Sequence, residues 1–282
     1  MFKLFGVDDA ANQGPAASFT FTVDTTGPVA AITGPTSTND TTPTFSYTFN
    51  ETITSGTRQC SLQPSGQPDS FASCSTSYTP PTPLADGEYD FKVRANDQLG
   101  NPGTTTHAVT IDGTAPTVTM TDGPASASND TTPTFTFTTG DAVTIRCSLT
   151  LAGAANSFSD CTSPYEASTL ADGAYEFKVR GTDSSGNVGS TTYAFTVDTT
   201  GPIVTISGAE QTTDTTPTFS FSFNEPVDPT SVECSLVPAG SPNSYVPCSS
   251  PFTQPTPLDD GSYAFRVRAS DVLGNSGNLS TK

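Results

Sequence analysis

Aspartate is the residue whose placement in this chain most suggests chemistry, because it returns at regular intervals. Asp24 is followed by Asp112 and Asp198 in closely similar surroundings. Carboxylates are the ligands that Ca²⁺ prefers, so such sets would form cation sites if they met in space. Aspartate is also a common turn residue that bonds its own backbone, and this simpler role stays open. Three further sets recur in the same way: Asp40/Asp130/Asp214, Asp86/Asp172/Asp260 and Asp97/Asp183/Asp271.

The six cysteines recur with the same period. Cys60, Cys147 and Cys234 are spaced 87 residues apart, and a second cysteine follows each of them after 14 residues. One disulfide per repeat is the interpretation that needs the fewest assumptions, and it indicates an oxidising compartment. Zinc is the competing chemistry, but the chain has no Cys-x-x-Cys and only one histidine. The expected pairs are Cys60–Cys74, Cys147–Cys161 and Cys234–Cys248.

No catalytic site is predicted. His107 is the only histidine, and it aligns with Phe19 and Tyr193, so we expect it to pack as an aromatic residue does. The sequence has no Gly-rich phosphate-binding loop and no pair of metal-binding histidines. The paired carboxylates recur in every repeat, and three identical active sites in one chain are less plausible than a structural role. We therefore predict that the protein is not an enzyme.

The elements that must position these residues form a repeat of about 87 residues. The segment 23–28 returns at 111–116 and 197–202, and the segment 84–94 returns at 170–180 and 258–268. The predicted boundaries are the last two strands of a preceding repeat (1–24) and three repeats (25–112, 113–198 and 199–282), of which the third lacks its last strand. These uneven ends suggest a piece of a longer array. A rarer alternative is that the N-terminal strand completes a neighbouring copy of the chain.

Each repeat carries strand signals. Phe45, Tyr47 and Phe49 alternate with polar residues, which is typical of a half-buried strand. Pro and Gly clusters interrupt the chain every ~8–12 residues, which gives about seven strands per repeat. We predict an all-β fold of tandem seven-stranded, immunoglobulin-like or fibronectin type III-like β-sandwiches. Tyr89, in Leu84-x-x-Gly-x-Tyr, matches the tyrosine corner of such folds, with a core-filling tyrosine as the alternative.

Strand order then places the acidic residues at the two poles of a sandwich. Asp40, Asp86 and Asp112 are expected at the C-terminal pole of the first repeat, facing Asp183 and Asp141 of the second. The next set is Asp130, Asp172 and Asp198, facing Asp271 and Glu225. Gathered carboxylates repel one another unless a cation lies among them, and Ca²⁺ takes about six to eight oxygen ligands. Ca²⁺ between domains is therefore the one cofactor expected, and Asp24 and Asp97 complete its candidate ligands.

The charge balance limits the partners. The formal net charge is −18, which repels nucleic-acid backbones and anionic membranes. The longest apolar runs are too short to span a bilayer. Membrane insertion and nucleic-acid binding are therefore not expected.

Four motifs recur along the chain: Val-Asp-Thr-Thr-Gly-Pro, Asn-Asp-Thr-Thr-Pro-Thr-Phe, Leu-Ala-Asp-Gly-x-Tyr-x-Phe-x-Val-Arg and Asp-x-x-Gly-Asn. Together they resemble the bacterial immunoglobulin-like repeats of large secreted surface proteins and adhesins. The resemblance implies an extracellular or cell-surface spacer or adhesin stalk, in some relatives stiffened by Ca²⁺ between domains. The partners would be neighbouring repeats of a longer chain and an unknown cell-surface or matrix ligand. The alternative is a non-catalytic accessory module that recognises carbohydrate or protein on a cell or phage surface.

Overall fold

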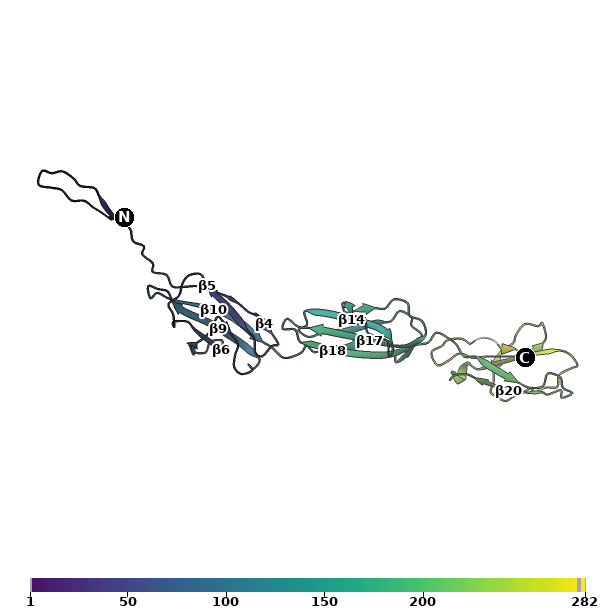
Figure 1. Cartoon of the computed structure of the whole chain (residues 1–282). Coiled ribbons are helices and arrows are strands. Elements are labelled where there is room, and N and C mark those ends of the chain that lie inside the picture. Colours follow the sequence, from purple (N-terminus) through teal and green to yellow (C-terminus); the bar gives the residue numbers. More distant parts are fainter. Residues whose placement is uncertain (1, 278–279, 282) are drawn as a thin grey trace. The chain divides into compact units, whose positions relative to one another are not determined.

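The computed structural model describes residues 2–277 and 280–281 of the chain, and Figure 1 shows the course of its strands. The chain divides into two compact units. Unit 1 comprises residues 1–115 and 184–187, and unit 2 comprises residues 116–183 and 188–282. Within the described residues, all regular structure is β except for one 3₁₀ turn, η1 (Pro229–Ser231). No helix in this part of the chain is long and apolar enough to cross a bilayer. The predicted all-β fold of tandem sandwiches is confirmed.

The first repeat is a sandwich of a three-stranded sheet, β3-β5-β8, and a five-stranded sheet, β4-β10-β9-β6-β7. The short strand β4 pairs in parallel with β10, whereas the long hairpin β9–β10 is antiparallel over ten residue pairs. The strands are β3 (Ala30–Thr33), β4 (Ser37–Thr38), β5 (Phe45–Phe49), β6 (Gln59–Pro64), β7 (Ala72–Ser73), β8 (Ser77–Tyr78), β9 (Gly87–Asn96) and β10 (Pro102–Ile111).

The second repeat has the same arrangement, with sheets β11-β13-β16 and β12-β18-β17-β14-β15. Its strands are β11 (Thr119–Asp122), β12 (Ala127–Ser128), β13 (Thr134–Thr138), β14 (Thr144–Leu151), β15 (Ser159–Asp160), β16 (Tyr165–Glu166), β17 (Gly173–Thr182) and β18 (Val188–Val197).

The third repeat has sheets β19-β20-β23 and β22-β21-β24-β25. We expected it to lack its last strand; instead, the two residues of β25 pair with β24 at that position. Its strands are β19 (Val204–Ser207), β20 (Thr218–Phe223), β21 (Glu233–Pro238), β22 (Val246–Pro247), β23 (Phe252–Thr253), β24 (Tyr263–Arg268) and β25 (Ser280–Thr281).

The first strand of repeats 1 and 2 is split between the two sheets, so eight segments are seen where seven strands were predicted. β3 pairs with β5, whereas β4 pairs with β10 in the opposite sheet. Gly34-Pro35 lies at the break in repeat 1, and Gly123-Pro124 lies at the break in repeat 2. Proline has no N–H to donate to a sheet ladder, so the strand ends there and resumes in the other sheet.

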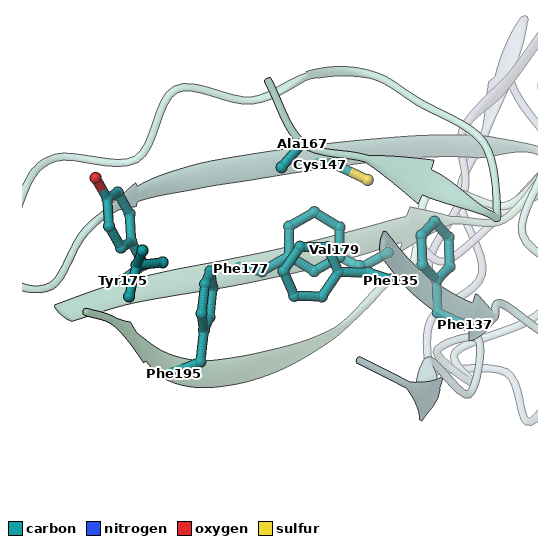
Figure 2. Close-up of a cluster of buried hydrophobic side chains, with 9 residues drawn as sticks. Phe135, Phe137, Cys147, Ala167, Tyr175, Phe177, Val179 and Phe195 are labelled. Atoms are coloured by element: carbon teal, nitrogen blue, oxygen red, sulfur yellow. The ribbon is translucent and has the colours of Figure 1, made fainter. Parts of the chain in front are cut away.

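The core of each repeat is built on a stacked pair of phenylalanines from opposite sheets. In repeat 2, Phe135 of β13 stacks on Phe177 of β17, and both are drawn in Figure 2. Their ring centroids lie 4.2 Å apart. Phe45 and Phe91 stack at 4.5 Å in repeat 1, and the third repeat has the same pair. Burying such a side chain contributes about 1.5–3 kcal/mol. The apolar residues of the period-two pattern therefore lie on the inner faces of both sheets.

Each repeat contains one disulfide. The bonds join Cys60 to Cys74, Cys147 to Cys161 and Cys234 to Cys248, which are the pairs that the repeat indicates. The first cysteine lies in β6, β14 or β21 and is buried, and the second follows the short strand β7, β15 or β22. The Cα–Cα distances of 5.7–5.8 Å are in the usual range for disulfides.

The tyrosine corner is present in all three repeats. The hydroxyl of Tyr89 donates to the backbone oxygen of Ala85 at 3.1 Å, and Tyr175 bonds Ala171 in the same way at 3.0 Å. Tyr263 donates to Asp259 at 3.2 Å. These residues therefore hold the turn before β9, β17 and β24, and Tyr89 and Tyr175 also pack in the cores of their repeats.

His107 packs where Tyr193 packs in the next repeat. Its ring lies edge-on to Phe45 with centroids 5.8 Å apart, and Nε2 lies 3.0 Å from the backbone oxygen of Pro35. The hydroxyl of Tyr193 donates to the backbone oxygen of Pro124 at the equivalent break between β11 and β12. The histidine therefore has the structural role expected of an aromatic residue.

Before the first repeat, β1 (Phe2–Leu4) and β2 (Ala17–Phe19) form a hairpin. Phe2 pairs with Phe19, which is the register of the last two strands of a repeat. The side chains of Phe19, Phe21 and Val23 are exposed.

Candidate functional site

Carboxylates gather in threes at the N-terminal poles of the first and third repeats. One group is Asp24, Glu51 and Asp97 in unit 1; the other is Asp198, Glu225 and Asp271 in unit 2. Within each group, one oxygen atom from every side chain lies within 4.8 Å of the others. The first residue of each group precedes its repeat, the glutamate follows β5 or β20, and the last aspartate follows β9 or β24.

The turn after β9 is built around the buried carboxylate of Asp97. Its Oδ1 accepts the backbone N–H of Leu99 at 2.9 Å and that of Asn101 at 2.7 Å, and its Oδ2 accepts the Asn101 side-chain amide at 2.7 Å. Burial alone raises the pKa of Asp97, but the hydrogen bonds from Asn101, Leu99 and Gly100 outweigh it, so the pKa is lowered. The carboxylate therefore stays charged and holds the turn closed.

The same turn follows β24, with Asp271 in the place of Asp97. Its Oδ1 accepts the backbone N–H groups of Leu273 and Asn275 at 2.8 and 2.9 Å, and its Oδ2 accepts the Asn275 amide at 2.8 Å. Burial again raises the pKa of Asp271, but the hydrogen bonds from Asn275, Leu273 and Gly274 lower it by more. The pKa is therefore below its ordinary value. The turn of the N-terminal hairpin uses Asp8 and Asn12 similarly.

The asparagine of this turn also holds the chain segment that precedes its repeat. The amide of Asn101 donates to the backbone oxygen of Asp24 at 3.1 Å, and the amide of Asn275 donates to that of Asp198 at 2.8 Å. Each asparagine thus bridges two members of one carboxylate group. Sequence reasoning missed this role, although the Asp-x-x-Gly-Asn motif contained the signal.

Glycines allow the preceding segment to lie directly against the repeat. A Cβ on Gly27 would lie 2.1 Å from the backbone oxygen of Pro102, and one on Gly103 would lie 1.8 Å from that of Pro28. Gly201 and Gly277 make the same approach in the third repeat. Any other residue would push the backbones apart, so the Gly-Pro step fixes where Asp24 and Asp198 lie.

Glu225 experiences the negative charge of its group most clearly. Its pKa is raised above the ordinary 4.5 because burial and the charges of Asp198 and Asp271 disfavour its ionised form. All three causes act in the same direction. A divalent cation among the three carboxylates would remove this repulsion.

Other predicted ligands make local turns. Asp40 accepts the backbone N–H of Thr42 at 2.9 Å, and Asp130 and Asp214 do the same with the residue two positions on. Asp24, Asp112 and Asp198 make this bond as well. This is the turn role that the sequence left open.

Asp86 and Asp172 instead hold the segment that leaves their repeats. Asp172 accepts the backbone N–H of Thr199 at 2.9 Å and the hydroxyls of Thr199 and Thr200. These bonds lower its pKa. Asp86 accepts the N–H of Gly113 at 2.9 Å and the hydroxyl of Thr114 at 3.1 Å.

The structure thus groups only part of the predicted ligand set. Asp24, Asp97, Asp198 and Asp271 lie in the two groups, together with Glu225, which was named as a neighbour. Glu51 was missed, although its alignment with Glu225 after an Asn was visible in the sequence. Neither group includes the six other predicted ligands, Asp40, Asp86, Asp112, Asp130, Asp172 and Asp183.

The donor sets suit a hard cation. Each group offers three carboxylates, and neither contains a cysteine or histidine, so zinc is a poor match. Asp97 and Asp271 already accept N–H bonds, but a carboxylate has about four acceptor positions, so some capacity remains. Ca²⁺ would also need backbone oxygens and water to reach about six to eight ligands.

One arginine each of β9, β17 and β24 stacks on an aromatic ring. The guanidinium of Arg94 lies 3.9 Å from the ring centroid of Phe71, and Arg180 covers Phe158 at 4.3 Å. Arg268 covers Tyr245 at 4.1 Å. These rings lie in the loops that the disulfides close, and each has one face occupied by an arginine.

Three tandem immunoglobulin-like sandwiches, each with its own core and disulfide, define the class of protein. A family model described as "Bacterial Ig-like domain" matches residues 31–113, 117–199 and 205–282. The chain therefore belongs to the bacterial Ig-like domain family, as the sequence motifs predict. The matched domains take up most of the chain, and no catalytic domain is identified in it.

Comparison with other proteins gives the following similarities. No curated protein sequence matches the chain. The solved structures that match include a tetra-tandem repeat in the extending region of a large adhesion protein, with 18% identity and a TM-score of 0.35, covering 99% of this chain and 80% of that one. They also include fibronectin(III)-like modules of Clostridium thermocellum CbhA, with 18% identity and a TM-score of 0.36, covering 60% of this chain and 94% of that one.

Proposed function

We propose that this chain is a non-catalytic, extracellular spacer or adhesin stalk built of bacterial Ig-like domains. The observation that carries the proposal is the near-complete use of the chain for three domains of one family, each built on the same core and the same turns. Three similar domains in series give length and mechanical continuity, which a stalk needs and a single binding site does not.

The disulfides support a location outside the cytoplasm. Each closes a loop between residues 14 positions apart, and none of the six cysteines is free. Disulfides persist in oxidising environments such as the cell surface. A surface or secreted location follows from the proposal.

The aromatic residues of the three repeats favour the stalk over a carbohydrate-binding accessory module. A sugar platform needs an open aromatic face. Phe71, Phe158 and Tyr245 each lie beneath an arginine, and the chain has no tryptophan. The accessory role therefore has less support.

Removing one repeat tests the spacer role. Deletion of residues 113–198 joins Asp112 to Thr199 and preserves the Asp-Thr-Thr-Gly-Pro junction. A spacer should lose length in proportion, so the maximum dimension from small-angle X-ray scattering should fall by about one third of the three-repeat value. An unchanged maximum dimension, with all domains folded by circular dichroism, would contradict the proposal.

We further propose that Ca²⁺ binds at the two carboxylate groups and stiffens the attachment of the first and third repeats to the segments before them. The raised pKa of Glu225 supports this, because burial and the charges of Asp198 and Asp271 disfavour its ionised form, which a bound cation would stabilise. Asn275 joins Asp271 to the backbone of Asp198, so a cation there would reinforce an existing connection.

The double variant Glu51→Gln/Glu225→Gln tests the calcium proposal. In chelator it should melt at or above the temperature of the unmodified chain, because repulsion has been removed. In Ca²⁺ the unmodified chain should melt higher than in chelator, and the double variant should lose most of that increase. Glu88→Gln/Glu166→Gln is the matched control, since both residues are exposed and lie outside the groups. An equal calcium effect in both double variants would rule out these sites.

A further inference from the structure

The first two repeats share a contact between the segment by which the chain enters the repeat and the strand by which it leaves. In repeat 1, β4 follows the entering strand β3, and β10 is the last strand. The two run in parallel, with Ser37 opposite Thr110 and Thr38 opposite Ile111. In repeat 2, β12 and β18 pair in the same way. Each parallel pair therefore joins the entering part of a repeat directly to the leaving part.

Tension along the chain would make the strands of this pair slide past each other. Because the strands are parallel, a pull on the chain before the repeat draws β4 towards the N-terminal pole, and a pull after the repeat draws β10 towards the C-terminal pole. The backbone bonds between the strands cross the direction of sliding, so they are stretched at the same time rather than broken one after another.

Two backbone hydrogen bonds hold each pair. In repeat 1, the N–H of Thr110 donates to the oxygen of Thr36 and the N–H of Asp112 donates to the oxygen of Thr38, both at 3.0 Å. Repeat 2 has the same two bonds at 2.9 and 3.0 Å, from Thr196 to Ser126 and from Asp198 to Ser128.

A side chain of the last strand adds a third bond to each pair. Nε2 of His107 lies 3.0 Å from the backbone oxygen of Pro35, and the hydroxyl of Tyr193 donates to the backbone oxygen of Pro124. A carbonyl oxygen only accepts, so Nε2 is the donor in repeat 1. Both prolines lie at the break where the first strand changes sheets, and a backbone oxygen that leaves a sheet ladder still needs a donor. The last strand supplies it in both repeats.

Packing holds these two side chains at the break. The ring of His107 lies edge-on to Phe45 with centroids 5.8 Å apart, and the ring of Tyr193 lies edge-on to Phe135 at 6.0 Å. Gly123 lets Tyr193 approach the break, because a Cβ at this glycine would lie 3.1 Å from Cζ of the ring. The donors are therefore placed by the core and not by chance surface contacts.

The residues that follow on the last strand are buried. Val109 and Ile111 of β10 lie in the core of repeat 1, and Phe195 and Val197 of β18 lie in the core of repeat 2. Sliding of the last strand would pull these apolar side chains out of the core while it stretches the three bonds, so both effects oppose the same movement.

We propose that the parallel pair is the mechanical clamp of repeats 1 and 2, which means the contact that must break before the repeat unfolds under tension. His107 and Tyr193 are the side chains that strengthen it. The inference rests on the proposed stalk function, since a stalk carries tension from one end of each repeat to the other. Hydrogen bonds outside the pair, such as those of the tyrosine corner, are not stretched until the pair has separated.

Single-molecule pulling of the full chain at constant force tests the clamp. The double variant His107→Phe/Tyr193→Phe keeps two aromatic rings and removes both donors. Two of the three unfolding events should then occur about five to ten times faster than in the unmodified chain, because one net hydrogen bond per repeat is lost before the barrier is crossed. The third event, from repeat 3, should keep its rate.

Tyr89→Phe/Tyr175→Phe is the matched control. It removes one bond to a backbone oxygen from each of the same two repeats, and each of these bonds spans only four residues. The control should change the rates at constant force less than about twofold, because these bonds remain intact until the clamp has separated. The single variant His107→Tyr should keep the unmodified rate, since Tyr193 makes the corresponding bond in repeat 2.

Denaturant unfolding without force should show that both double variants fold and lose similar stability, so that a difference under force reflects the direction of the load. Equal rates for the two double variants at constant force, or unmodified rates for His107→Phe/Tyr193→Phe, would overturn the proposal. Deletion of residues 113–198 measures length and not lifetime under force. A chain that shortens as expected but fails the pulling test keeps the spacer role and loses the clamp.

Discussion

At the scale of single residues, Asp97 and Asp271 do more than an exposed turn aspartate does. Each is buried, each closes its own turn, and each contacts through an asparagine the segment that precedes its repeat. Both the turn role and the grouped arrangement weighed from the sequence are therefore present in these two residues. Cation binding at the groups stays a prediction.

Glu225 predicts an unusual pH dependence in the absence of divalent cations. Its pKa in the folded state is above 4.5, so the folded chain binds more protons than the unfolded chain between that pKa and 4.5. The free energy of unfolding should then rise as the pH falls through this window. Denaturant unfolding in chelator measures it, and Glu225→Gln should abolish the rise.

The opposite trend should begin at lower pH. Asp172 and Asp271 have pKa values below the ordinary 3.8, so their stabilising contributions are complete above 3.8 and are lost as the pH falls through the lowered values. Carboxyl titrations by NMR should show Glu225 titrating above 4.5 and Asp271 below 3.8. Titration of Glu225 at or below 4.5 would contradict the charge distribution described above.

Tyr→Phe substitutions at two positions show how much a tyrosine hydroxyl contributes to stability when its ring is kept. Tyr175→Phe removes the bond to Ala171 and should cost about 0.5–1.5 kcal/mol. Tyr245→Phe should cost nothing or stabilise, because its buried hydroxyl has no partner among the described residues and the other repeats have Phe71 and Phe158 there. Amide hydrogen exchange in β17 and β24 measures both. Equal destabilisation by both substitutions would contradict these assignments.

At the scale of elements, each disulfide ties β6, β14 or β21 to the residue that follows the short strand β7, β15 or β22. Cys147→Ser/Cys161→Ser opens a loop of 14 residues in repeat 2 and should cost about 3 kcal/mol. The loss should be confined to repeat 2, which amide exchange in β14 and β17 can show. An undisturbed second repeat would mean that its core alone sets its stability.

The strands show which structural features the alternation of apolar and polar residues predicts. Phe45, Tyr47 and Phe49 were placed on one face by alternation; Phe45 and Tyr47 are buried and Phe49 is half-buried. The split of the first strand into β3 and β4 was not predicted. Alternation gives the face of a strand but not the sheet to which the strand hydrogen-bonds, because the partner backbone lies about 70 residues away.

At the scale of the whole molecule, three domains in series should unfold one at a time under load. Pulling on the chain in single-molecule force spectroscopy should give three unfolding events in oxidising buffer. Reduction should lengthen each event by about 50 Å, because 14 residues are released at ~3.5 Å each. Unchanged event lengths after reduction would mean that the disulfides do not close these loops in solution.

The sequence by itself determined the repeat, the all-β class, the cysteine pairs and the inner faces. These features repeat with a fixed period or alternate along a strand, so they can be recognised from the order of the residues alone. Only the tertiary structure decided which acidic residues meet. Asp24 and Asp97 lie 73 positions apart in the sequence, yet they join Glu51 because a Gly-Pro step and an asparagine amide press one segment against the pole of a sandwich. Asp40 and Asp86 have equally regular spacing, but their oxygens are taken up by local turn bonds and by the departing segment. The spacing of the aspartates in the sequence predicts at which pole of the sandwich they lie. The packing of the chain at that pole sets the distances between their carboxylate oxygens.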